Sequence, residues 1–387
     1  MGGIEVFPSY QHVRAFMKRY GMEAEFSPPY QLINPDNGAR APISHIHNGL
    51  PLTARVVFFA DIARYFLIRR RYARFVDDPE GVQPDPEGDL AMPFEAFLRH
   101  HGLQSLARLF HVPVTNYGYG FLDEIPAAYA LKYMRPGMLD AFIAYGLGRR
   151  QAIGWLPRVG YQGLMSALAA DLGDCVRTGV RDIAVTRDER ILVRIGDHPP
   201  ETYDLLIVAS PDAATCLDLT EEEAGVLRRV THRNYATVLL EADGIPPGGY
   251  GFNLGEGGAV VAPRDRGPLQ MLRPWEDRPH VICYAYARDA AVGLEDLVER
   301  CRETVERIGG QVREVLDARA WSYFPHLDCA ALREGQSDRL RALQRSHPRT
   351  RWAGSLFSFE IVEDAMAQAA HLVDTVLAEE APAARSN

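Results

Sequence analysis

A strand, a glycine turn and a helix follow one another near the C-terminal end of this chain. The segment RWAGSLFSF reads as a strand that enters a turn at Gly354, and the next helix begins near Val362. A glycine at such a turn lets the backbone approach a bound phosphate closely. The N-terminal amides of the helix, with Glu363 in its first turn, would face an electron-rich group. The pattern predicts a ligand-binding turn, and a turn without a ligand is the alternative.

A second segment has the order of elements that places a ligand at the end of a parallel sheet. A helix over 164–172 leads to a short strand at Val180, then to a hairpin, and then to an apolar run over 203–209. The apolar run is typical of a buried parallel strand, which Ser210 and Pro211 end. Because parallel sheets bind ligands at their strand ends, the turn after this strand is a candidate site.

Composition indicates an ordinary globular protein. The chain has 387 residues, 47% hydrophobic and 24% charged, enough for two domains with a sizeable core. A net charge of −9 argues against nucleic acid as a partner. The five cysteines are scattered and form no CxxC pair, which favours neither zinc nor a disulfide framework. With no signal peptide before Met1, and no run apolar enough to span a bilayer, we expect a cytoplasmic protein.

Helical periodicity is strongest in the first half of the chain. Residues 9–20 read as a helix capped by Ser9, and residues 53–75 as a helix rich in arginine. The apolar face of the second helix is predicted to hold Val56, Phe59, Ala63 and Phe66. Further helices are expected over 92–102, 103–111, 125–148, 294–308 and 361–378. Strands of a mostly antiparallel sheet are expected over 235–242 and 281–287.

Several runs carry a resemblance to a known family. In order along the chain they are MGGIEVFPSY, MPFEAFLRHHG, VTNYGYGFLDEIPAAYALKY and WSYFPH, the last an aromatic-rich turn. The closing segments WAGS and IVEDA resemble the flavin-binding end of the amine-oxidase/phytoene-desaturase superfamily. From Met1 to about Val376 the chain is similar to the polyenoic fatty acid isomerase group of FAD flavoproteins. The resemblance implies an α/β (α+β) fold with an FAD-binding, Rossmann-like parallel sheet, a mixed-sheet substrate domain and a helical cap.

The resemblance also divides the chain into three parts. The FAD-binding domain would comprise 1–25, 160–215 and 345–380, and it would be incomplete, with its N-terminal unit missing. The substrate-binding sheet would comprise 26–50 and 220–340, and the helical cap 51–158. The family's GxGxxG turn, which holds the FAD pyrophosphate, does not follow a strand near the start of this sequence. We expect either a truncated gene model or a protein that lost this anchor, inactive as written, and intact remaining motifs favour truncation.

The cofactor implied by the resemblance is FAD. Met1, Gly2 and Gly3 match the family's loop beside the isoalloxazine, and Val180 matches the residue that lies against the adenine. The other implied cofactor contacts are Ala209, Ser210, Pro211, Gly354, Ser355, Val362 and Glu363. At Ser355 the family usually has an acidic residue that holds a ribityl or ribose hydroxyl, and a serine bonds more weakly than a carboxylate.

The reaction that the resemblance implies is hydride transfer to and from the flavin on a small apolar substrate. A polyunsaturated, fatty-acid-like molecule is the example that the family offers. Such a site needs apolar walls and few acids or bases. Candidate pocket residues are Tyr117, Tyr119, Phe121, Tyr129, Tyr133, Trp155, Trp321, Tyr323 and Phe324, with core packing as the alternative for each. The family's carboxylate-binding arginine is absent from residues 26–31, and Arg40, Arg55 or Arg64 could replace it.

Two other functions stay open. An amine oxidase usually keeps a lysine near the flavin in the second half of the chain, and no lysine follows Lys132 here. A remnant or partner subunit that kept the fold and lost the chemistry is the non-enzymatic alternative. His45 and His47, and the pair His100 and His101, have no third ligand spaced nearby, so no metal site is expected. The helix over 53–75 is either an ordinary surface helix or one that contacts a membrane surface peripherally. The oligomeric state is not predicted.

Overall fold

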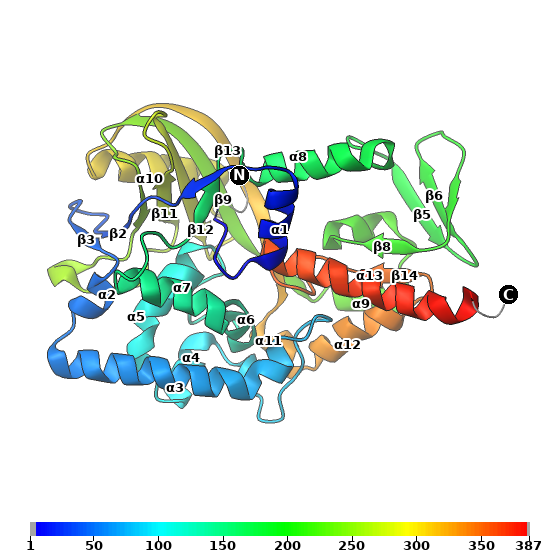
Figure 1. Cartoon of the computed structure of the whole chain (residues 1–387), viewed down its shortest axis with the longest axis horizontal. Coiled ribbons are helices and arrows are strands. Elements are labelled where there is room, and N and C mark those ends of the chain that lie inside the picture. Colours follow the sequence, from blue (N-terminus) through cyan, green and yellow to red (C-terminus); the bar gives the residue numbers. More distant parts are fainter. Residues whose placement is uncertain (1–4, 385–387) are drawn as a thin grey trace.

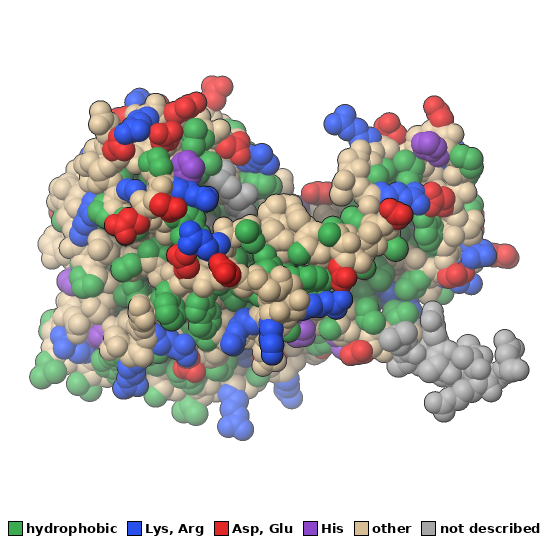
Figure 2. Space-filling model, turned by 45° about the horizontal axis from the view of Figure 1, so that its top comes forward, with side chains coloured by type: hydrophobic (Ala, Val, Ile, Leu, Met, Phe, Trp, Pro, Cys, Tyr) green, Lys and Arg blue, Asp and Glu red, His purple; other side chains and the backbone are tan. Residues whose placement is uncertain are grey.

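The chain folds into a larger body and a smaller unit that three helices connect. The computed structural model describes residues 5–384, with side chains as far as residue 376. In Figure 1 the larger body, on the left, has a twisted sheet above a layer of helices. The smaller unit lies on the right. The connecting helices are α1 (Gln11–Arg19), α8 (Gly160–Leu172) and α13 (Val362–Ala384). Figure 2 shows the face hollowed between the two parts.

The sheet of the larger body has seven strands in the order β13-β9-β12-β11-β10-β2-β3. Only the contact between β10 and β2 is parallel among these neighbours. The strands expected over 235–242 and 281–287 are confirmed and pair antiparallel within this sheet. The bounds are β2 Tyr30–Ile33, β3 Arg40–Pro42, β9 Val230–Asp243, β10 Gly248–Gly251, β11 Gly267–Arg273, β12 His280–Ala287 and β13 Gln311–Leu327.

Alternation along β12 gives the sheet two different faces. Val281 and Cys283 are buried with the apolar residues of α10 (Leu294–Arg307), which covers one face. Tyr284 and Tyr286 belong to an aromatic cluster on the opposite face. Successive side chains of a strand point to opposite sides, so a single strand supplies both environments. The aromatic face is the one that borders the site described below.

The helical layer confirms the predicted cap but changes its details. The expected helix over 125–148 is two helices, because Pro136 cannot continue the first and begins the second. The helix expected over 53–75 extends over Leu52–Val76 as α3. The helices of this layer are α2 (His45–Asn48), α3, α4 (Phe94–His100), α5 (Ala107–Phe110), α6 (Ala127–Tyr133) and α7 (Pro136–Gly146).

The predicted apolar face of α3 was right for Phe59 and Phe66, which pack partly buried against the core, and wrong for Val56 and Ala63. Val56 is 63% exposed and Ala63 is exposed too, whereas Phe58, Ile62 and Tyr65 are buried. The predicted set of residues and the buried set are offset by about one residue along the helix. Each set is apolar and repeats at helical spacing. Periodicity alone therefore could not choose the face that packs, and an apolar stripe remains on the surface.

The smaller unit holds the parallel sheet. An antiparallel sheet of β5 (Ile183–Arg187), β6 (Ile191–Ile195) and β7 (Glu201–Tyr203) confirms the predicted hairpin. Beside it, β8 (Leu206–Val208) pairs parallel with β14 (Thr350–Trp352). The expected burial of β8 is only partial, since Ile207 is 47% exposed and no described element covers that side chain. Short elements complete the fold: β1 Ala24–Phe26, β4 Trp155–Pro157, α9 Glu221–Leu227, α11 Cys329–Arg333 and α12 Gln336–Ala342.

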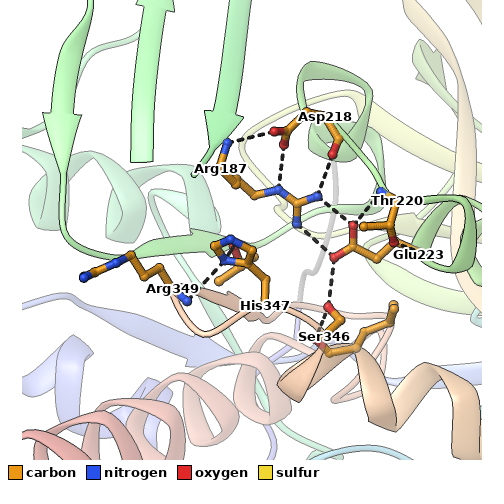
Figure 3. Close-up of polar contacts among 9 residues, drawn as sticks. Arg187, Asp218, Thr220, Glu223, Ser346, His347 and Arg349 are labelled. Carbon is orange, nitrogen blue, oxygen red and sulfur yellow. Dashed lines mark hydrogen bonds and ion pairs between the residues drawn. The ribbon is translucent and has the colours of Figure 1, made fainter. Parts of the chain in front are cut away.

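A buried ion-pair cluster joins the elements of the smaller unit. The Arg187 guanidinium, at the end of β5, donates hydrogen bonds to both carboxylate oxygens of Glu223 at 2.6 and 2.9 Å and to Asp218 at 2.8 Å (Figure 3). Glu223 also accepts from the amide of Thr220 and from the hydroxyl of Ser346. Two Thr220–Glu223 bonds form a capping box that begins α9. The cluster therefore ties β5, α9 and the segment before β14 together.

Two further expectations were wrong. Tyr10, not Ser9, precedes the first helix, and neither of these two side chains caps it; the Ser9 hydroxyl has no hydrogen-bond partner among the described atoms. WSYFPH is the last part of the long strand β13 rather than a turn. Register shifts between Tyr323 and His326, where Phe324 has a φ of 54°. Of the described helices, none is long and apolar enough to cross a membrane.

Candidate functional site

A cavity of about 430 Å³ lies between the seven-stranded sheet, the helical layer and the start of α13. This volume is within the usual range of small-molecule sites. The sheet contributes Thr237 and Met271, the helical layer Tyr133, and the first turn of α13 Val362 and Ala365. Elements that are far apart in the sequence therefore meet around one space, which the fold itself positions.

Tyrosine side chains form much of the cavity wall. Tyr119 is central, because its ring lies 4.8 Å from that of Tyr133, 4.9 Å from Phe359 and 5.8 Å from Tyr323. Burial raises the pKa of every lining tyrosine above its ordinary value, so these hydroxyls stay protonated. The lining tyrosines are Tyr10, Tyr30, Tyr117, Tyr119, Tyr133, Tyr161, Tyr235, Tyr284 and Tyr323.

A half-buried carboxyl group, that of Glu5, belongs to this aromatic wall. Burial raises the pKa of Glu5, although hydrogen bonds from Tyr117 and Ser27 oppose the shift. The Tyr117 hydroxyl donates to the Glu5 carboxylate, and the Tyr161 hydroxyl donates to the Glu5 carbonyl at 3.0 Å. A raised pKa favours the protonated form of this carboxyl, and shifted pKa values are common at functional sites. Sequence reasoning missed Glu5, because its partner Tyr117 lies 112 residues away.

A second carboxyl group borders the cavity where α13 begins. Burial raises the pKa of Glu360, and a hydrogen bond with Ser355 opposes the shift. One carboxyl oxygen of Glu360 has no hydrogen-bond partner among the described atoms, and neither has the hydroxyl of Tyr284. Buried polar atoms are nearly always bonded, so these two are placed to bond a ligand. Glu360, five positions after Ser355, thus places a carboxyl group beside that serine at the cavity.

The far end of the cavity carries neutral polar groups. The Tyr30 hydroxyl donates to the side-chain oxygen of Gln270 at 3.1 Å and accepts from the Asn116 amide at 2.9 Å. Both Tyr30 and Gln270 line the cavity. Their bonds are satisfied within the protein, so they fix the shape of this end rather than offer a charge.

No arginine, lysine or histidine belongs to the described lining of the cavity. The three arginines considered as carboxylate partners are engaged elsewhere. Arg40 lies over the ring of Tyr250, and Arg55 donates to backbone carbonyls near the start of α3. Arg64 bonds to Asp61 and to the carbonyls that follow α4. The only ionisable groups of the described lining, besides tyrosine hydroxyls, are two carboxyls.

The predicted pocket residues divide into two groups. Tyr117, Tyr119, Tyr133, Trp321 and Tyr323 line the cavity. The other four lie outside its lining. Phe121 packs within an aromatic cluster under Arg288, and Phe324 is 1% exposed in the core. The Tyr129 hydroxyl accepts from the amide of Leu327, and Trp155 pairs with Val6 and stacks on Phe26. Core packing, the alternative weighed for each aromatic, holds for Phe121, Tyr129 and Phe324, whereas Trp155 is only partly buried.

The predicted cofactor residues are partly brought together. Met1, Gly2 and Gly3 lie outside the described residues. The turns after β8 and β14 lie against each other, since a Cβ on Gly354 would stand 2.1 Å from the carbonyl oxygen of Ala209. Gly354 has a φ of 89°, so both its backbone conformation and this contact require glycine. Ser355 and Val362 line the cavity.

The remaining cofactor candidates have other positions. Ser210 caps the 3-10 helix that starts at Pro211, and Val180 lies in the coil ahead of β5 instead of in a strand. The Glu363 carboxylate accepts hydrogen bonds from the backbone amides of Gln11, His12 and Val13 at 2.7 to 3.0 Å. This side chain therefore caps α1 and does not face the cavity, and only its backbone could contact a ligand there.

The histidine pair of α4 has a neighbour that its spacing did not reveal. Asp89 is buried and brings its carboxylate within 4.8 Å of the ring nitrogens of His100 and His101. Asp89 already accepts a hydrogen bond from Tyr72, and it faces His101 at 3.3 Å. The Asp89 carboxylate thus already has hydrogen-bond and ion-pair partners within the chain.

Comparison with known proteins gives one family. The family model of the flavin containing amine oxidoreductases matches residues 1–377. An FAD-dependent oxidoreductase of Apiospora sacchari is 28% identical over 222 residues, which are 50% of this chain and 42% of that protein. The chain thus matches less than half the length of that relative.

Solved structures show the same fold. A CLA-producing fatty acid isomerase from P. acnes has a TM-score of 0.81 at 21% identity, over 97% of this chain and 86% of the isomerase. Wild-type putrescine oxidase bound to putrescine has a TM-score of 0.68 at 12% identity, over 97% of this chain and 88% of the oxidase. The predicted combination of α/β architecture, mixed sheet and helical layer is confirmed.

Proposed function

Since this chain belongs to the flavin containing amine oxidoreductase family, we propose that it binds FAD and transfers hydride to and from an apolar substrate in the tyrosine-walled cavity. The observation that carries the proposal is the meeting, in one cavity, of an aromatic wall with two unpartnered polar atoms, on Glu360 and Tyr284. A flat, mostly apolar ring system with a polar edge matches that combination of groups.

The residues at the start of α13 fit a flavin. Ser355 and Glu360 offer a hydroxyl and a carboxyl oxygen to ligand hydroxyls or N–H groups. The first turn of α13 begins at the cavity wall, and its backbone amides suit an electron-rich carbonyl edge. When bound, FAD supplies the hydride acceptor and donor. The chain's own residues orient both ligands and exclude water, since tyrosine rings and aliphatic side chains form most of the wall.

Glu5 is the group we propose to hold a proton beside the substrate. Its raised pKa favours the protonated form more than an ordinary glutamate does, and Tyr117 fixes the orientation of its carboxyl. Once it has released that proton, the Glu5 carboxylate would stabilise the carbocation-like carbon that hydride loss leaves, or would take up a proton from the adjacent carbon so that a double bond forms. In an isomerisation, Glu5 would return this proton to another carbon of the substrate, and the hydride would be returned as well.

The charge of the cavity restricts the substrate. A fatty acid carboxylate would meet Glu5 and Glu360 without a cation among the described lining residues, which is unfavourable in an apolar site. An unsaturated fatty-acid-like substrate is therefore proposed to enter in neutral form, as the protonated acid or an ester. The absence of a cation specifically favours a second candidate, oxidation of an amine, because the Glu5 carboxylate and tyrosine faces suit an ammonium group.

The first test is flavin retention by the purified chain. We expect visible flavin absorption to remain after incubation with FAD and gel filtration. Glu360→Gln should retain less flavin, whereas Tyr129→Phe, changed outside the cavity, should retain as much as the parent. A colourless protein in every form contradicts the proposal and favours the non-catalytic remnant.

The second test distinguishes substrate classes with one tail and three head groups. Linoleic acid, its methyl ester and the corresponding C18 dienyl amine are added anaerobically to the flavin-loaded protein, and bleaching of the flavin is followed. Faster bleaching by the ester than by ionised acid supports the lipid proposal, and fastest bleaching by the amine supports amine oxidation. Equal rates for the acid and the ester would contradict the argument from charge.

A further inference from the structure

The exposed face of α3 carries a continuous stripe of side chains. Leu52, Val56, Ala60, Ala63, Leu67, Arg70 and Arg74 are spaced by three or four residues, and every one of them is exposed. Residues at this spacing lie on one side of a helix. The stripe spans 22 residue steps, or about 33 Å at 1.5 Å per residue. This set of seven residues is called the α3 stripe below.

The first part of the α3 stripe is unusually apolar for a surface. Leu52 is 74% exposed, Leu67 71% and Val56 63%, and Val57 beside them is 52% exposed. No other described helix exposes as many large aliphatic side chains to this degree. Exposed apolar surface gathered along one element marks an interaction site, whereas scattered apolar residues do not.

The last part of the α3 stripe is basic. Arg70 and Arg74 are exposed, and neither has a carboxylate within ion-pair distance among the described residues. Most neighbouring arginines are engaged, as Arg71 is with Glu87 and Arg64 with Asp61. Two positive charges without a carboxylate partner among the described residues, one of them over the ring of Phe75, thus stand beside an apolar strip on a chain whose net charge is −9.

The position of α3 leaves the stripe accessible. The helix runs along the lower edge of the molecule in Figure 1, with its N-terminal end on the left. Along the lower edge of Figure 2, apolar side chains gather on the left, and basic side chains project farther to the right. The stripe is a narrow ridge rather than a groove, so a rigid protein partner would cover little of it.

We propose that the α3 stripe docks on an anionic lipid surface. Leucine and valine side chains can insert singly into the fluid boundary between headgroups and acyl chains, and arginines pair with lipid phosphates and serine headgroups. The acidic remainder of the chain is repelled by the same surface, which fixes the orientation. Charge complementarity and apolar exposure on one ridge are the grounds for choosing a membrane over an acidic protein.

Apolar side chains pack in a continuous series from α3 to the wall of the cavity. A small cleft beside α3 is lined by Phe59 and Ile62 from this helix and by Phe142 from α7. The ring of Phe142 lies 5.7 Å from that of Phe7 and 6.3 Å from that of Tyr117, both of which line the cavity. A docked α3 would therefore hold an apolar flank of the cavity close to lipid; this one argument rests on the proposed function.

The test is sedimentation of the full chain with vesicles of phosphatidylcholine, with and without phosphatidylserine. We expect salt-sensitive binding to the anionic vesicles. Arg70→Ala with Arg74→Ala should weaken binding about twenty-five-fold at low salt, at about fivefold for each basic residue. Leu52→Ser with Leu67→Ser should weaken binding about tenfold or more, because two aliphatic side chains no longer insert.

The matched controls change similar residues on other elements. Leu172→Ser removes a leucine that is 50% exposed on α8, and Arg194→Ala removes an exposed arginine of β6. Both should bind vesicles like the parent chain, and thermal unfolding should confirm that all variants are folded. No binding of the parent to anionic vesicles, equal losses in the controls, or retention by an acidic protein instead of vesicles would overturn the proposal. Vesicle binding needs neither flavin nor substrate, so failure of the proposed enzyme function would not affect it.

Discussion

Replacement of Arg187 by methionine should destabilise the protein by about 3–5 kcal/mol, the range for breaking a buried ion pair by removing one partner. The Arg187 side chain is 2% exposed and the Glu223 side chain 1% exposed. Methionine keeps most of the volume but removes the donors of both bonds to Glu223 and of the bond to Asp218. A carboxylate would then be left in an interior that has no cation beside it.

The lowered pKa of Glu223 indicates the combined contribution of its hydrogen-bond donors, of which Arg187 is the one with a charge. Burial alone would raise this pKa, but hydrogen bonds from Arg187, Thr220 and Ser346 lower it from 4.5 to about 2. A shift of that size corresponds to about 3 kcal/mol at neutral pH. A group with a depressed folded-state pKa stabilises fully above its unfolded pKa of 4.5, and this stability is lost as the pH falls towards 2.

The assay is chemical denaturation of the parent, Arg187→Met and the double variant Arg187→Met with Glu223→Gln, between pH 7 and pH 3. The double variant should recover much of the loss, since a glutamine can still accept from Thr220 and needs no cation. The difference between parent and Arg187→Met should shrink as the pH falls, because the unpaired Glu223 becomes protonated. A loss below about 1 kcal/mol, or no recovery in the double variant, would refute the reasoning about buried charge.

Three other changes test the site and its supports. Gly354→Ala should destabilise by more than about 1 kcal/mol, because the added carbon meets the Ala209 carbonyl at 2.1 Å, and denaturation measures the loss; a neutral change would contradict the contact. Glu363→Gln should destabilise by about 1–2 kcal/mol through weaker capping of α1, with flavin retention unchanged. Glu5→Gln should remove from the pH–rate profile an ionisation that lies above the ordinary glutamate range, while Tyr145→Phe keeps it.

Local sequence patterns predicted the elements whose partners are nearby or whose period is clear. The strands around Tyr235 and Tyr284 and the helix from Leu52 have strong periodicity, and the structure confirms them. The face on which α3 packs was not predictable, since the stripe that contains Phe58 and the stripe that contains Val56 are both apolar and both repeat at helical spacing. The choice between them depends on α6 and the helices around it, which only the tertiary fold brings there.

The candidate site was predictable in its aromatic part and not in its charged part. Tyr117, Tyr119 and Tyr133 belong to one distinctive run, so a local signal identified them. Glu5 acquires its role only through Tyr117, and Glu360 only through the turn that places it over Ser355. A glutamate is ordinary on a surface, and nothing in its local sequence indicates that burial will change its pKa.

Three glutamates with shifted pKa values show how the fold separates support from function. Glu223 is buried against a guanidinium, and its pKa falls to about 2 despite burial. Glu5 and Glu360 are half-buried in one cavity whose described lining holds no cation, and desolvation raises their pKa values. A carboxylate that needed only to stabilise the fold would gain from an arginine such as Arg187, and the chain is rich in arginine. That two carboxyls lack such a partner where tyrosines enclose a cavity is therefore best explained by what the cavity binds.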